Sequence, residues 1–132
     1  MKQTALGFSK KVDMEFAQAL DAVKKGLERE GFSILTEVDV QKTMKNKLNV
    51  EFNPYTILGA CNPSLSHEAL AAEEQIGLML PCKFIVYVND NGDTVVAAID
   101  PVKAMELVDN ADLAAVAANV RSKFVKVLDS LK

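Results

Sequence analysis

Residues 82–99 read CKFIVYVNDNGDTVVAAI, and this stretch decides the fold. Two runs rich in strand-forming residues flank Asn91-Gly92, which is a strong signal for a β-hairpin. The expected turn is of type I′, in which both central residues have a positive φ. Because a hairpin puts an antiparallel pair into the sheet, the stretch predicts a mixed or mainly antiparallel α+β sheet with helices packed over it. A doubly wound parallel fold is not expected.

On either side of the hairpin, the spacing of apolar residues switches between a period of two and a period of three to four, so strands and helices alternate. The first helix should end near Gly31, since glycine suits the left-handed position after a helix. The expected elements, in chain order, are a strand over 4–12, a helix capped by Asp13, a strand over 32–38, a short helix capped by Asp39, a strand over 55–60, a helix from Asn62-Pro63 to about Glu74, the hairpin, a helix starting at Asp100-Pro101 and a long helix from about Asn110. The order is roughly β-α-β-α-β-α-β-β-α-α, in one domain over residues 1–132.

Composition and charge narrow the function classes. The 132 residues are 49% hydrophobic and 25% charged, with 15 basic and 18 acidic residues mixed along the chain. The net charge of −3 and the lack of a basic stripe argue against nucleic-acid binding. Neither a secretory signal nor a membrane-spanning apolar run is present. We therefore expect a cytoplasmic protein with no nucleic-acid or membrane partner, whose two cysteines are thiols rather than a bridge.

Familiar catalytic motifs are missing from the sequence. It has no glycine-rich phosphate loop, no Gly-x-Ser-x-Gly elbow and no Cys-x-x-Cys pair. His67 is the only histidine, which excludes a histidine-rich metal site. The sequence therefore favours a non-enzymatic protein, and no cofactor is predicted.

The residues that remain as candidates lie mostly between Ile57 and Cys82. Cys61 is expected at the end of a strand, just before the helix cap Asn62, where the helix N-terminus would lower the pKa of a thiol. His67 lies on the first turns of that helix, and Cys82 starts the next strand. If the two strands are neighbours, both thiols lie at one end of the sheet and close together. A packing role for both cysteines stays open, because free cysteine is often simply buried.

A series of short motifs extends from about Gly7 to Val108. They are Gly31-Phe32, Thr36-Glu37-Val38-Asp39-Val40, Ile57-Leu58-Gly59-Ala60-Cys61-Asn62-Pro63, Ala69-Leu70, Gly77-Leu78-Met79-Leu80-Pro81-Cys82, and Asp100-Pro101 with Met105. Together these motifs closely resemble the domain of unknown function 302 family. The paired Cys-Asn-Pro and Leu-Pro-Cys elements, in this order, make the resemblance specific.

The resemblance implies a small α+β domain with a curved antiparallel sheet and helices on one face, laid out broadly like a TATA-binding-protein half-repeat. Related domains tend to pair as homodimers, and no activity is assigned to the family. The layout does not imply DNA binding, because fold does not fix function. The final helix from Asn110 lies beyond the motifs and is expected to pack on its own sheet or on a second subunit. The characteristic residues that carry over are Cys61, Asn62, Pro63, Pro81, Cys82, Asp100 and Pro101.

Three functions fit the candidate residues Cys61, Asn62, His67, Cys82 and Asp100. The first is a non-enzymatic binding domain that homodimerises and binds a small ligand or partner in the concave face of the sheet. The second is a thiol-based redox or stress function, with Cys61 reactive and Cys82 as the resolving thiol. The third is metal or haem-group handling through Cys61, His67 and Cys82, a set that lacks the fourth ligand of a structural zinc site.

Overall fold

The computed structural model describes residues 1–132 and contains one six-stranded sheet in the order β1-β2-β6-β5-β4-β3. Every neighbouring pair of strands is antiparallel, which confirms the hairpin and the α+β fold class. The strands are β1 (Lys2–Gln3), β2 (Gly7–Val12), β3 (Ser33–Asp39), β4 (Tyr55–Cys61), β5 (Cys82–Val88) and β6 (Thr94–Ile99).

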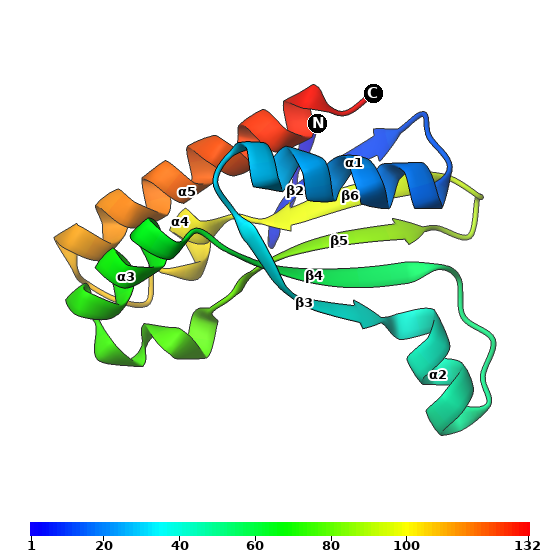
Figure 1. Ribbon diagram of the computed structural model, residues 1–132, viewed down its shortest axis with the longest axis horizontal. Helices are drawn as coiled ribbons and strands as arrows, with labels where there is room; N and C mark the ends of the chain where they lie inside the picture. Colours follow the sequence, from blue (N-terminus) through cyan, green and yellow to red (C-terminus); the bar gives the residue numbers. More distant parts are fainter.

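The helices lie mainly on one face of the sheet. They are α1 (Phe16–Arg29), α2 (Val40–Leu48), α3 (Pro63–Ala72), the 3₁₀ helix η1 (Glu74–Met79), α4 (Pro101–Ala104) and α5 (Ala111–Ser130). Figure 1 shows α1 and α5 over the sheet and α3 beside α5, whereas α2 projects from the end of β3. None of these helices has the length and apolarity needed to cross a bilayer.

The core lies between the sheet and the helices α1 and α5. Phe124 of α5 is fully buried, and its ring centroid lies 5.1 Å from that of Phe32 and 4.7 Å from that of Phe84 on β5. Helix α5 thus packs on its own sheet, which settles the choice that the sequence left open. The buried residues of α5 are Leu113, Val116, Ala117, Val120, Phe124, Val127 and Leu128.

The two ends of the chain are fastened together. The Lys10 ammonium donates hydrogen bonds to the main-chain carbonyls of Leu128 and Leu131, at the end of α5. The Asp13 amide donates to the carbonyl of Lys132. Strand β2 therefore holds the last turn of α5 in place through polar contacts as well as through apolar packing.

Most helix caps confirm the expected boundaries, but the first one does not. Asp39, Asn62, Asp100 and Asn110 each accept a hydrogen bond from a backbone amide in the first turn of the helix they precede. The expected cap Asp13 is wrong, because α1 begins after Glu15. There, the Gln18 side chain accepts a hydrogen bond from the Glu15 amide. Gly31 has φ +86° and confirms the left-handed position after α1.

Two other boundaries differ from the expected ones. Helix α3 ends at Ala72 instead of near Glu74, because Glu73 is extended and its carboxylate caps η1 by accepting from the Gln75 amide. The hairpin turn is not of type I′, since Gly92 has φ +84° but Asn91 does not have a positive φ. The Asn89 side chain instead accepts from the Asn91 and Asp93 amides and organises a longer loop.

Candidate functional site

The two cysteines share one end of the sheet but not one face. Strands β4 and β5 are neighbours, as the two-thiol hypothesis requires, and Ala60 is the residue paired with Cys82. Successive strand residues point to opposite faces, so Cys82 lies with Ala60 in the core and Cys61 points the other way. Both cysteines are free. The expectation that the two thiols lie together is therefore wrong.

The Cys82 thiol is a poor candidate for a nucleophile. Burial raises its pKa to about 11; nearby Lys83 pulls the pKa down, and Cys61 adds a smaller upward effect. A thiol with this pKa stays protonated near neutral pH, and the protonated form does not attack disulfides. Cys82 packs in the apolar core, which matches the plain packing role.

Cys61 and His67 flank the start of α3 without forming a metal site. The Cys61 sulfur lies 2.8 Å from the Ser66 hydroxyl oxygen. The side-chain oxygen of Asn62 accepts a hydrogen bond from the Leu65 amide. His67 is exposed. The structure contains no group of three or more His, Cys, Asp and Glu side chains arranged to hold a metal ion. Hence the ligand set expected from Cys61, His67 and Cys82 does not form.

Asp100 is buried and joins three elements. One carboxylate oxygen accepts from the Val102 amide at the start of α4, and the other lies 3.4 Å from Nε of Arg121 on α5. The Arg121 guanidinium lies 4.9 Å from the centre of the Phe8 ring on β2. A buried carboxylate needs such partners to offset its lost hydration. Asp100 therefore acts as a structural anchor between β2, α4 and α5, apart from the cysteines.

Another candidate surface, of which the sequence analysis named no residue, is a face of the sheet that we call the free face. It is the face of the sheet turned away from α1 and α5, and two rows of side chains cross it. The strand registers align one row of aliphatic residues and a second row that begins with two tyrosines. The rows are Val38, Ile57, Ile85 and Ala97, and Tyr55, Tyr87 and Val95.

The free face is largely apolar, and most of its side chains are half-buried, although Val95 is buried. The rings of Tyr55 and Tyr87 stack with centroids 5.3 Å apart, and burial, with a smaller contribution from Tyr87, raises the pKa of Tyr55. A hollow of ≈480 Å³ opens beside these rings. Its lining includes Leu6, Lys83, Ile85, Tyr87, Ala97 and Ile99. Such a surface suits an apolar partner better than a charged one.

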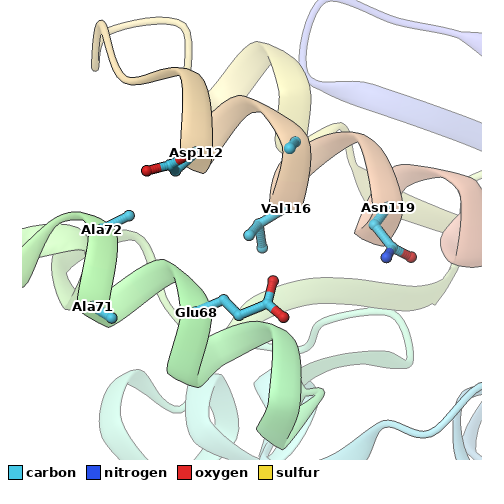
Figure 2. Close-up of a pocket in the computed structure, with 7 residues that line it drawn as sticks. Glu68, Ala71, Ala72, Asp112, Val116 and Asn119 are labelled. Carbon is cyan, nitrogen blue, oxygen red and sulfur yellow. The ribbon is translucent and has the colours of Figure 1, made fainter.

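A second groove of ≈510 Å³ runs between α3 and α5. Figure 2 shows Glu68 of α3 reaching across it toward Val116 and Asn119 of α5. Asp112 adds a second carboxylate, and alanines form much of the remaining lining. No cation, thiol or imidazole lines this groove.

The sequence did not identify the residues of the free face, because alternation marks two sides of a strand without saying which side the helices cover. Ile57 and Ile85 alternate with core residues such as Phe84, and all of them are apolar. The available signal was the presence of apolar residues on both sides of β4, β5 and β6. In an antiparallel sheet with helices on one face only, the second apolar side indicates a contact surface.

The comparisons with known proteins agree on one family. The family model described as Domain of unknown function DUF302 matches residues 8–131. This match includes α5, and therefore extends past the quoted motifs, which end near Val108. A crystal structure of an uncharacterized conserved DUF302 protein from Bacillus stearothermophilus has a TM-score of 0.90 at 24% identity, covering 98% of this chain and 100% of that one. That likeness is one of fold. A search of the curated proteins finds no match.

Proposed function

The chain belongs to the DUF302 family of domains of unknown function, and on this premise we propose that it is a non-enzymatic interaction domain. It pairs with a second copy of itself through the free face. The observation that carries this proposal is the pair of apolar rows that no helix covers. Exposed apolar areas of this extent mark contact surfaces in soluble proteins.

The contrast between the two faces supports this function. On the covered face, Leu58, Phe84 and Val96 are fully buried under the helices. On the free face, Ile57 and Ile85 are only half-buried although they belong to the same strands and are equally apolar. Covering them would remove further apolar surface from water, at about 25 cal/mol for each Å². A second layer is the arrangement that completes a sheet with only one face covered.

A second copy is the partner that best fits the free face. Two sheets pack about 10 Å apart with their side chains interdigitated. A two-fold axis that lies between the two sheets, next to Ile85, would lay the aliphatic row of one copy against that of the other, and such a contact is self-complementary. Charges lie at the margins of the face, at Lys11 and Lys83, so the centre contains no ion that dimerisation would strand.

Sedimentation equilibrium of the full chain tests the proposal. The unmodified protein should form dimers, and Ile85→Asp should raise the dissociation constant at least about a hundredfold, because the dimer would bury an unpaired carboxylate. Val38→Asp, at a site already 44% exposed, should act in the same direction without disturbing the monomer. Leu107→Asp is the matched control, since Leu107 is 89% exposed and lies after α4. A monomeric unmodified protein, or folded variants that dimerise unchanged, would contradict the proposal.

A further inference from the structure

A second feature of the structure concerns the segment 40–52, which we call the arm. It contains α2 and the connection to β4, and α2 buries none of its residues. Its caps are nevertheless well formed: Asp39 accepts from the Lys42 amide, and Asn49 closes the helix in the left-handed conformation with φ 53°. A helix of nine residues is marginal on its own in water. The arm therefore has local order without the packing that usually supports a helix of this length.

Polar contacts hold the arm in shape and leave its apolar side chains outside. Gln41 donates to the Phe52 carbonyl at 2.9 Å, and Lys45 pairs with Glu51 at 2.7 Å. The exposed fractions are 66% for Leu48, 46% for Val50 and 40% for Phe52. Three large apolar side chains within five residues form a patch that nothing in the chain covers.

The arm is continuous with the free face. The Phe52 ring packs edge-on against Tyr55, with centroids 6.2 Å apart, and Tyr55 in turn stacks on Tyr87. At the other side of the arm, Val38 precedes α2 and pairs with Ile57. The apolar surface of the arm is thus an extension of the two rows on the sheet, reaching past the edge strand β3.

Area is the reason why the extension matters. Five strands about 4.8 Å apart and about 20 Å long give the free face roughly 500 Å² in outline. A stable interface takes about 800 Å² from each partner. The arm is the adjoining apolar surface, and it enlarges the area that a dimer could bury.

Charge also points to a second copy. The arm holds Lys42, Lys45 and Lys47 against the single acid Glu51, a net charge of +2. The rest of the chain then has 12 basic and 17 acidic residues, a net charge of −5. The arm of one copy and the body of another therefore attract each other, whereas two bodies without arms would repel.

We infer that each arm reaches across to the second copy and packs Leu48, Val50 and Phe52 against it, so that two reciprocal arms close the dimer. This inference rests on the proposed function, because it assigns the arm to the same dimer. A two-fold axis makes the two arm contacts equivalent, so each dimer gains both. The lysines at the arm surface make the contact sensitive to salt.

The test is a pair of matched double variants. Leu48→Ser with Val50→Ser should raise the dimer dissociation constant roughly tenfold to a hundredfold while leaving the fold unchanged. Leu78→Ser with Leu107→Ser makes the same chemical change at side chains that are 86% and 89% exposed, and should leave the constant unchanged within about twofold. Hydrogen exchange supplies a second readout. The amides of α2 should exchange more slowly at protein concentrations above the dissociation constant of the dimer than at concentrations below it.

The outcomes separate the two proposals. A dimer whose constant is unaffected by the arm variant, with no concentration-dependent protection of α2, would overturn the role of the arm and leave the free-face dimer standing. A monomeric unmodified protein would overturn the free-face dimer itself. Arm-dependent binding to phosphatidylserine vesicles, with an unchanged dimer constant, would assign the arm to a lipid surface and also overturn the inference.

Discussion

Helices α2 and α5 have the same kind of N-terminal cap, but they lie in opposite environments. Asp39 caps one and Asn110 caps the other, each by accepting from amides of the first turn. Helix α5 buries seven residues against the sheet and α3, whereas α2 buries none. Local chemistry therefore specifies both helices, while tertiary packing supports only one of them. The difference shows that α5 is part of the protein's own core, whereas the side chains of α2 remain free to contact another surface.

The largest effect expected from this comparison is on stability. Phe124→Ala should lower the free energy of unfolding by about 3–5 kcal/mol, because it leaves a cavity between Phe32 and Phe84. Leu48→Ala removes an exposed side chain of α2 and should change the free energy of unfolding by less than about 0.5 kcal/mol. Urea unfolding at concentrations where the protein is monomeric measures both values. Similar losses for the two variants would show that α2 is packed after all.

A pH experiment measures the burial of the covered face directly. The folded-state pKa of Cys82 is raised to about 11 by burial, above the value near 8.5 of an unfolded thiol. The stability from the protonated thiol is therefore present below about pH 8.5 and is lost as the pH rises through 11, by about 3 kcal/mol in all. Comparing urea unfolding of the unmodified protein with Cys82→Ala between pH 8 and 11 isolates this contribution. Parallel pH curves for the two proteins would contradict it, while Cys61→Ala, which keeps Cys82, serves as the control.

The smallest expected effect compares the two caps. Asn110→Ala should cost about 1 kcal/mol of global stability, because the start of α5 is coupled to the core. Asp39→Ala removes an equivalent hydrogen bond. It should nevertheless lower the global free energy of unfolding by a few tenths of a kcal/mol at most, because the arm can unfold locally while the rest of the domain stays folded. Its effect should be visible instead as faster hydrogen exchange within α2 of the monomer. Equal global losses at the two caps would place the arm inside the cooperative unit.

The sequence predicted those parts of the fold that depend on local signals. The caps Asp39, Asn62, Asp100 and Asn110 were predictable because a side-chain acceptor next to a helix start acts within three residues. The hairpin was predictable for the same reason, although its turn type depended on how Asn89 bonds across a five-residue loop.

The candidate site was less accessible from the sequence. Cys61 and Cys82 were expected together because their strands are neighbours at one end, and only the one-residue offset in register separates their faces. Register depends on pairing between distant segments, which spacing along the chain does not encode. The residues of the free face were not identified for a related reason, because their exposure depends on which face of the sheet α1 and α5 cover.

The fastening of β2 has a consequence for how the chain is made. Strand β2 joins the main sheet by pairing with β6, so that Gly7 lies opposite Ile99, and Lys10 then holds the final turn of α5. Strand β2 therefore cannot complete its contacts until β6 and α5 have formed. A nascent chain that ends before α5 lacks one of the two helices that cover the sheet, so folding during synthesis gains little from the early segments. Completion of the domain therefore waits for the synthesis of α5.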